Sequence, residues 1–535
     1  MMKKMLSVVF SCMLVLALIV SGCSASTSSS KEGGNKNIAA NTLIYGRGGE
    51  AVSLDPAIVI DGESFIVTEQ IFENLVQYGK DNMEIEPGLA SKWEVSPDGL
   101  KYTFHLREGI KFHDGTDFNA EAVVKNFQRW AKSKDPGKFA YYASMFGGFE
   151  GDEGHVIKEV KAIDPKTVEI NLLHPQAPFL KNIAMSPFVI SSPTALEKDE
   201  EGFGRNPVGT GPFKFKAWKP NDIIELEKNE EYWQNGLPKL AGVKIKMIKD
   251  NSSRLNALIK GEIDLMEGLN PSDMNKVKEN KDLQLIERPS MNVGFLGFNV
   301  EKEPFNKKEV RQAISHLINK EEIIKNFFGG TAEPAKNPMP PSINGYNDDI
   351  QDREYNVEKA KELLKQAGLE KGFKMDLWAM PVARPYMPNG QKVAEAIQAS
   401  LKQANIDAKI VTFEWGAYLE KVQAGEASAF ILGGTGDNGD ADNFLYTLLD
   451  KDSIGSNNYS RYNNEEVHKL LIEAQRISDE NKRNALYKKA QEIIHEDAPW
   501  VPLVHSKPQL AGSVTVKGFF PHPTGVQSFV DVSLN

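Results

Sequence analysis

Apolar and polar residues alternate in short segments along the first part of the chain. Residues 102–106 and 168–172 place apolar side chains at every second position, which predicts strands with one buried face. Residues 42–46 predict another strand that ends in a glycine turn, and Pro97-Asp98-Gly99 predicts a turn before residue 102. Residues 65–76 carry apolar side chains at helical spacing and predict a helix.

The second half of the chain predicts helices that are followed by strands. Asn356 is a suitable N-cap for a helix that continues to Ala367, and Gly368 follows where such a helix would end. Ile397, Leu401 and Ala404 mark a further helix, and residues 408–411 predict the strand after it. This order predicts an α/β fold with a partly parallel sheet.

The first 22 residues differ from the rest of the chain. Lys3 and Lys4 precede an apolar run over residues 5–20, which is slightly short for a membrane-spanning helix and is typical of a signal-peptide core. The run ends in Val20-Ser21-Gly22-Cys23, which resembles a bacterial lipobox, in which the cysteine is acylated and becomes the new N-terminus. An ordinary secretory signal with a chance cysteine is the alternative.

We therefore expect a lipoprotein signal peptide over residues 1–22 and lipidation at Cys23. Residues 23–41 are rich in Ser, Gly, Asn and Lys, and they predict a flexible tether. The mature protein is then anchored at the extracytoplasmic face of the cell membrane through its lipid. Cys12 and Cys23 are the only cysteines, so cleavage and lipidation would leave no disulfide and no thiolate metal site.

Length and charge narrow the class of protein further. With 535 residues, the chain predicts two or three packed units. Its net charge of −10 argues against a nucleic-acid partner. The absence of a fixed-period repeat and of a long linker in the mature chain favours two lobes that are connected more than once.

A search for catalytic and metal motifs finds no complete set. None of the nine histidines lies in an H-E-x-x-H motif, and the sequence has no G-x-S-x-G elbow and no P-loop. The acidic residues 437–442 do not fit an EF-hand loop, because a loop starting at Asp440 would place Leu445 at position 6 and Lys451 at position 12. We expect no catalysis, no metal and no cofactor.

Four segments resemble the family 5 solute-binding proteins of peptide and nickel importers. They are Pro87-Gly88-Leu89-Ala90-Ser91-Lys92-Trp93-Glu94-Val95, Thr103-Phe104-His105-Leu106-Arg107-Glu108-Gly109, Asn206-Pro207-Val208-Gly209-Thr210-Gly211-Pro212-Phe213 and Val310-Arg311-Gln312-Ala313-Ile314. The resemblance extends along nearly the whole mature chain. It implies an α/β bilobal clam-shell of the periplasmic-binding-protein type, of the large kind called cluster C, with an extra subdomain in lobe I.

The resemblance also implies the limits of the lobes and the partners. Lobe I would comprise residues 42–289 and 507–535, with the subdomain at about 73–210, and lobe II would comprise residues 290–506. The protein would be a monomeric receptor that binds dipeptides or other short peptides between the lobes and delivers them to the permease of an ABC importer.

The roles of individual residues follow from the dipeptide-binding members of this family. The segment around Arg384 and Tyr386 resembles the one that binds the ligand carboxylate, and the segment around Asp437 resembles the one that binds the ligand ammonium. Arg offers a planar fork of donors to a carboxylate, and Asp offers a compact acceptor to an ammonium. Gly434 and Thr435 would pair with the peptide backbone, and Gly62 matches a lobe I loop that touches the ligand.

Alternative interpretations accompany these residues. Taken alone, Arg384 is typical of an exposed loop and Asp437 of a turn, while Tyr386, Trp378 and Trp415 are typical of a core. The dipeptide-binding members carry Trp where this chain has Gly434, which is expected to widen a side-chain pocket or to loosen selection for peptide length.

Rival functions also remain open. Within the same fold, the ligand could be an oligopeptide, a nickel chelate, glutathione or haem. Outside it, the protein could be a peptide-sensing surface lipoprotein without a transport role, or a secreted hydrolase.

Overall fold

A computed structural model describes residues 41–133, 135 and 137–535. The predicted signal peptide, the lipidation site Cys23 and all of the tether except Asn41 lie outside the described residues. Residues 41–535 form one compact unit, and none of the helices in the described ranges is long and apolar enough to cross a membrane.

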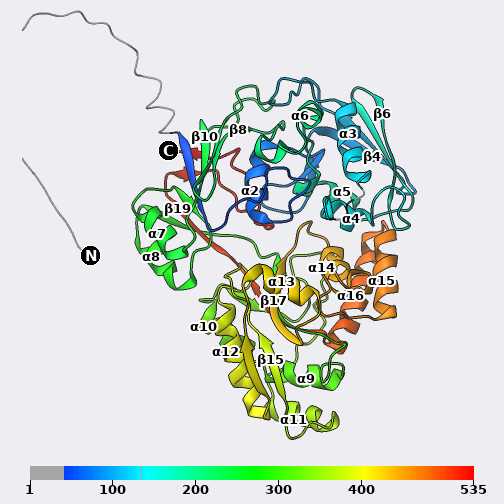
Figure 1. The fold of residues 1–535 in the computed structure, drawn as a ribbon, viewed down its shortest axis with the longest axis vertical. Coiled ribbons are helices and arrows are strands. Elements are labelled where there is room, and N and C mark those ends of the chain that lie inside the picture. Colours follow the sequence, from blue (N-terminus) through cyan, green and yellow to red (C-terminus); the bar gives the residue numbers. More distant parts are fainter. Residues whose placement is uncertain (1–40, 134, 136) are drawn as a thin grey trace, which may run out of the picture. The chain divides into compact units, whose positions relative to one another are not determined.

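Two large sheets and one smaller sheet organise the chain (Figure 1). The seven-stranded sheet contains, in spatial order, β12 (Leu283–Glu287), β19 (Gln509–Ser513), β11 (Leu265–Met266), β1 (Thr42–Arg47), β10 (Gly242–Met247), β9 (Ile223–Lys228) and β8 (Phe213–Lys219). The six-stranded sheet contains β14 (Ala332–Pro334), β18 (Trp500–Ser506), β13 (Asn292–Phe298), β17 (Ala429–Thr435), β15 (Lys374–Trp378) and β16 (Asp407–Val411). The four-stranded sheet contains β4 (Ala90–Val95), β5 (Lys101–Leu106), β7 (Thr167–Leu172) and β6 (Ile157–Asp164).

The remaining strands form two short ribbons, and helices surround the sheets. The ribbons pair β2 (Val76–Tyr78) with β3 (Ile85–Pro87) and β20 (Val516–Lys517) with β21 (Ser533–Leu534). The helices before β13 are α2 (Gly62–Ile71), α3 (Ala120–Ala131), α4 (Ala140–Phe146), α5 (Phe179–Ile183), α6 (Pro193–Lys198), α7 (Asn251–Ile259) and α8 (Met274–Glu279). Those after it are α9 (Lys308–Leu317), α10 (Lys320–Phe327), α11 (Val357–Gln366), α12 (Gly390–Leu401), α13 (Trp415–Gln423), α14 (Ala441–Leu449), α15 (Glu465–Arg476) and α16 (Glu480–Asp497). Short 3₁₀ turns occur at Ser186–Phe188, Phe203–Arg205, Pro271–Asp273, Lys402–Ala404 and Lys451–Ser453.

The buried apolar residues separate into two regions. One cluster draws its buried residues only from residues 291–504, which we call the second region. The other three clusters draw theirs only from residues 43–286 and 511–532, which we call the first region. Residues 287–290 and 505–510 connect the two regions. The predicted boundaries of lobe I, its subdomain and lobe II stay predictions.

The sheet of the second region has the mixed character that the sequence predicts. β15 pairs in parallel with both β16 and β17, whereas β13 runs antiparallel to β17 and β18. All seven residues of β13 are buried, so this strand is the centre of the core. Gly294 is needed there, because a Cβ atom at this position would lie 2.6 Å from the carbonyl oxygen of Tyr386.

Most of the predicted elements are confirmed, and one is wrong in its bounds. Asn356 caps α11 by accepting a hydrogen bond of 3.0 Å from the backbone N–H of Lys359. The helix expected over residues 65–76 instead spans Gly62–Ile71. Its start is fixed by Asp61, which accepts a hydrogen bond from the N–H of Ser64, and Val76 belongs to β2, where it pairs with Pro87. That pairing overrides the local helical pattern.

Candidate ligand-binding site

A cavity of about 1110 Å³ lies between the first region, the second region and the connecting segments. Its volume slightly exceeds the roughly 300–1,000 Å³ typical of small-molecule pockets. All six residues that the resemblance assigns to ligand binding line this cavity: Gly62, Arg384, Tyr386, Gly434, Thr435 and Asp437. Residues separated by up to 375 positions in the chain are thus brought together, although their roles remain predictions.

The two charged residues come from loops at one edge of the six-stranded sheet. Arg384 follows β15 and Asp437 follows β17, and these strands are parallel neighbours. The carboxyl ends of parallel strands meet at the same edge, which is where open α/β sheets usually bind ligands. The sheet therefore presents a cation and an anion from adjacent loops to the same cavity.

Asp437 is held by residues of both regions. Its backbone N–H donates to Oδ1 of Asn443 at 2.9 Å, and its carboxylate accepts hydrogen bonds from Asn443 and from Tyr141 of α4. Burial raises the pKa of the Asp437 carboxyl to about 6, although these two hydrogen bonds act in the opposite direction. No cationic side chain of the described residues forms an ion pair with it.

The loop that carries Asp437 is anchored firmly. Asp440 accepts two hydrogen bonds from the guanidinium of Arg483, at 2.7 and 2.6 Å. Burial acts to raise the pKa of Asp440, but the neighbouring Arg483 outweighs it and holds that pKa below its usual value. Across the cavity edge, Lys181 donates to the carbonyl of Gly439 at 2.8 Å, and Asn438 donates to Oδ1 of Asn182 at 2.8 Å. This loop, residues 436–440, which we call the anion loop, therefore also joins the two regions.

Arg384 is half-buried and forms no ion pair within 4.0 Å among the described residues. Its backbone forms a tight turn with Met387, with hydrogen bonds of 3.1 and 2.9 Å in the two directions. Its guanidinium lies 5.1 Å from the centre of the Trp415 ring, a cation–π contact that fixes the side chain without using its hydrogen-bond donors. The Glu63 carboxylate is close enough for its pKa to be lowered by Arg384.

The aromatic residues of the site only partly follow the core interpretation. Trp378 and Tyr386 are both buried in the cluster of the second region. Tyr386 nevertheless also lines the cavity. Trp415 is partly buried against the same cluster, as a core residue would be, and it also lines the cavity with Arg384 over its face. Its position at the first turn of α13 lets it do both.

Gly434 and Thr435 belong to a strand edge that is open on one side. β17 pairs with β13 over its whole length, from Ala429 to Thr435. On its other side, the pairing with β15 stops at Phe430. Backbone groups near Gly434 and Thr435 are thus free of a strand partner where they reach the cavity, which suits pairing with an extended chain. A Cβ atom at Gly434 would meet only Leu448, at 4.0 Å, so this glycine leaves open space.

Gly62 lies at the first residue of α2 rather than in the loop that the resemblance implies. The side chain of Asp61 caps the helix, so Gly62 is already helical. Gly62 lines the cavity, and a Cβ atom there would meet nothing within 4 Å.

Two further glutamates line the cavity and were missed by sequence reasoning: Glu69 in α2 and Glu73, two residues after the end of that helix. Burial raises the pKa of Glu69 to about 8 against one hydrogen bond, from Ser186. Burial raises the pKa of Glu73 to about 7 against hydrogen bonds from Thr210, Tyr232 and Trp233. A signal was present, because these two carboxylates lie four residues apart among the apolar positions of residues 65–76, and Glu is rarely buried without a partner.

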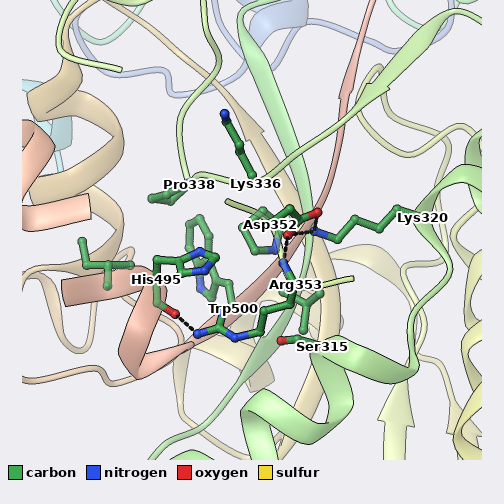
Figure 2. A pocket seen from close by; sticks show the side chains of 11 residues that line it. Ser315, Lys320, Lys336, Pro338, Asp352, Arg353, His495 and Trp500 are labelled. Carbon is green, nitrogen blue, oxygen red and sulfur yellow. Dashed lines mark hydrogen bonds and ion pairs between the residues drawn. The ribbon is translucent and has the colours of Figure 1, made fainter. Parts of the chain in front are cut away.

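A second cavity is too small to compete as a ligand site. Its volume of about 20 Å³ has room for roughly one water molecule. Figure 2 shows that its charged groups are already paired: Lys320 points at the carboxylate of Asp352, 2.7 Å away, and Arg353 donates to the carbonyl of His495. This pocket is therefore part of the core of the second region.

One further group has donors suited to a metal. Among the described residues, ligand atoms of Asp450, Asp452 and His468 lie within 4.8 Å of one another. Nδ1 of His468 already forms a hydrogen bond of 3.0 Å with Asp450, so the arrangement is explained without an ion.

Comparison with known proteins identifies the family. The model of the bacterial extracellular solute-binding proteins, family 5, matches residues 84–456. The chain belongs to this family. Family 5 membership agrees with the resemblance of the four sequence segments, which is thereby confirmed.

Individual relatives show that the similarity extends over nearly the whole chain. The dipeptide-binding protein of Escherichia coli strain K12 is 40% identical over 515 residues, covering 93% of this chain and 95% of the relative. Heme-binding protein A of Haemophilus influenzae is 37% identical and covers 97% of both chains.

A solved structure supports the fold. The ABC transporter-associated periplasmic binding protein DppA from Helicobacter pylori, in complex with the peptide STSA, matches with a TM-score of 0.83 and 39% identity. The match covers 92% of this chain and 98% of that one. The predicted α/β fold of the periplasmic-binding-protein type is therefore confirmed.

The anchoring of the anion loop can be tested by removing its buried cation. We expect Arg483→Met to lower the free energy of unfolding by about 3–5 kcal/mol, because the buried carboxylate of Asp440 then keeps only the N–H of Asp442 and Lys181, whose Nζ is 3.8 Å away. Urea unfolding followed by circular dichroism measures this. The control Lys421→Met removes an exposed pair with Glu426 and should change stability by less than about 1 kcal/mol. Equal effects of the two variants would contradict the anchoring role.

Proposed function

We propose that this protein is the receptor of an ABC-type peptide importer and that it binds short peptides, dipeptides among them, in the large cavity. The observation that carries the proposal is the pair of charged loops: Arg384 and Asp437 face one cavity from adjacent parallel strands, and neither has an opposite charge bound to it. A free peptide is a zwitterion that supplies the two missing partners.

The chemistry favours an extended peptide over other zwitterions. The ammonium and carboxylate of a peptide leave water when the cavity encloses them, which is costly unless each meets an opposite charge. Arg384 offers parallel donors to the carboxylate, and Asp437 offers an acceptor to the ammonium. Between them, the open edge of β17 at Gly434 and Thr435 can pair with the peptide backbone.

Relatives support the same class of ligand and transport role. The Escherichia coli relative is named a dipeptide-binding protein, and the Helicobacter pylori relative is described as associated with an ABC transporter and bound to a peptide. All three relatives are named as binding proteins rather than enzymes, which supports a non-catalytic receptor. We propose that it acts as a monomer and returns its ligand intact, unlike a secreted hydrolase.

Haem is the second candidate ligand, because a relative of 37% identity is named a heme-binding protein. Glutathione, a nickel chelate and longer peptides are the other candidate ligands. Mass spectrometry of ligand released from the denatured, purified protein separates these candidates, and calorimetry with Ala-Ala, a tetrapeptide, glutathione, haem and a nickel chelate ranks them. Uptake of labelled Ala-Ala by a deletion strain separates an importer receptor from a peptide-sensing lipoprotein.

Removing either charge should weaken peptide binding strongly. We expect Arg384→Gln and Asp437→Asn each to reduce the affinity for Ala-Ala by about 3–5 kcal/mol, a hundredfold or more, because one terminus of the ligand would be buried without a partner. Isothermal titration calorimetry measures this.

Matched controls remove the same charges elsewhere. Arg461 pairs with Glu301 away from the cavity, and Asp376 is exposed on β15, so Arg461→Gln and Asp376→Asn should bind Ala-Ala as the parent does. Normal binding by both Arg384→Gln and Asp437→Asn would refute the site.

Affinity should also depend on pH through Asp437. Its pKa of about 6 lies above the ordinary value, so the carboxyl becomes protonated as the pH falls through 6 and loses its attraction for an ammonium. Between pH 7 and pH 5, one proton must then be released on binding, and Kd for Ala-Ala should rise about tenfold.

Asp437→Asn isolates this effect from the other carboxyls of the cavity. Its residual binding should show a smaller change between pH 7 and pH 5, since only groups such as Glu63, Glu69 and Glu73 still titrate. The same pH dependence in the parent and in Asp437→Asn would exclude Asp437 as the group responsible.

We further propose that Cys23 carries the lipid that holds the receptor at the extracytoplasmic face of the cell membrane. The support is the order of Lys3 and Lys4, the apolar run and the Val20-Ser21-Gly22-Cys23 motif. Cys23→Ala should abolish incorporation of a labelled fatty acid and release the protein from the membrane fraction. Cys12→Ala should change neither, because cleavage removes Cys12. Labelling of Cys23→Ala would disprove this lipidation site.

A further inference from the structure

Arg288 is a buried cation without a bound partner. It follows β12 in the first connecting segment, where its backbone N–H donates to the carbonyl of Pro508 at 2.9 Å. The residue is 5% exposed and lines the large cavity. Its guanidinium forms no hydrogen bond and no ion pair within 4.0 Å with any described residue, and its Nε is fully enclosed without an acceptor.

Other buried cations of this chain do have hydrogen-bond acceptors. Lys320 donates to the carbonyl of Ala335 and to Asp352 at 2.7 Å each. Arg254 donates to three backbone carbonyls and to Asn251, and Arg311 donates to the carbonyls of Phe305, Asp497 and Ala498. Because an unpaired buried charge costs several kcal/mol, the absence of such partners at Arg288 needs a specific reason.

The groups around Arg288 do not neutralise it. Glu267 and Tyr45 act on it electrostatically from beyond ion-pair distance, and burial lowers the pKa of its guanidinium. Gly525 keeps the space around it open, since a Cβ atom there would lie 2.7 Å from Nη1. His522, on the same segment as Gly525, has its pKa lowered to about 4 by burial, so it is neutral at pH 7.

The wider charge balance of this end of the cavity stays positive. The guanidinium groups of Arg254, Arg288 and Arg384 on the cavity wall, and that of Arg47 behind it beside Glu63, stand against three carboxylates, Asp61, Glu63 and Glu267. Glu63 is shared with Arg47, whose Nη1 lies 3.8 Å from its carboxylate. Its raised pKa of about 7 weakens the negative side further.

Arg288 and Arg384 are attached to the same stretch of chain. The hydroxyl of Ser506 donates to the carbonyl of Pro385 at 2.6 Å, and the carbonyl of Pro508 accepts from Arg288. Two residues of extended chain span roughly 7 Å. The second connecting segment thus contacts the loop of Arg384 and the backbone of Arg288 through two residues, Ser506 and Pro508, that are two positions apart, and both arginines line one cavity.

We propose that Arg288 is a second carboxylate subsite in the cavity that Arg384 also lines, so that the receptor favours peptides that present a carboxylate to Arg288. This proposal rests on the proposed function. The second carboxylate can come from an acidic C-terminal side chain of a dipeptide, while the main-chain carboxylate binds Arg384. It can also be the main-chain carboxylate of a tripeptide that extends past Arg384.

Calorimetry with matched ligands tests the subsite and separates the two sources. The parent protein should bind Ala-Glu at least tenfold more tightly than Ala-Gln, and Arg288→Gln should bring the two within about twofold. If the tripeptide carboxylate is the source, Arg288→Gln should instead weaken Ala-Ala-Ala at least tenfold relative to its C-terminal amide. In either case the affinity of Arg288→Gln for Ala-Ala should stay within about twofold of the affinity of the parent protein.

Controls distinguish the possible failures. Lys249→Gln removes another cation of the cavity wall, one that is exposed, and should preserve the preference for Ala-Glu. If Arg288→Gln does not fold, Arg288→Lys keeps the charge, and the comparison of Ala-Glu with Ala-Gln in the parent still decides. The subsite is overturned if the parent protein binds Ala-Glu and Ala-Gln with equal affinity and also binds Ala-Ala-Ala and its C-terminal amide with equal affinity. No binding of any of these peptides overturns the proposed function itself.

Discussion

An enclosed charge must have a partner, and this constraint organises the whole structure. In the described core, buried cations such as Lys320, Arg311 and Arg483 are tied to carbonyls or carboxylates. Three charges on the wall of the large cavity, Arg384, Arg288 and Asp437, are the exception, because none of them has an oppositely charged partner within ion-pair distance. In a low-dielectric site such charges are costly alone and strongly attractive to an opposite charge. The same physics that stabilises the core therefore supports the proposal that the cavity binds a charged ligand.

The fold supplies the rigidity that this arrangement requires. Arg384 and Asp437 follow neighbouring parallel strands whose apolar residues belong to the buried cluster of the second region. Their loops therefore start from fixed points. The anion loop also bonds to α5 through Lys181 and Asn182, which belong to the other region. The proposed ligand contact of Asp437 and the contacts that join the regions thus share one loop. A peptide that fills the cavity is expected to favour the joined arrangement, because its two charges are satisfied only there.

Sequence reasoning succeeded where a pattern is local or where a known family supplies the rest. The cap at Asn356 and the strand at residues 102–106 depend on neighbours in the chain, and both are present. The end of α2 depends on the pairing of Val76 with β3, so the local helical pattern misjudged it. Arg288 carries no motif at all. Its significance appears only because the folded chain leaves a buried guanidinium without an acceptor.

Recognition at the two termini has a consequence for the space between them. If charges at the ends provide most of the specificity, as we propose, side chains in the middle need only room and water. Gly434 provides such room, because a Cβ atom there would have just one neighbour, at 4.0 Å. A glycine at this point removes an apolar wall without removing a charge, so it relaxes selection by shape while leaving selection by charge intact. Under the proposed function, the ligand class is then set by Arg384, Arg288 and Asp437, and the tolerance within that class is set by the empty space beside them.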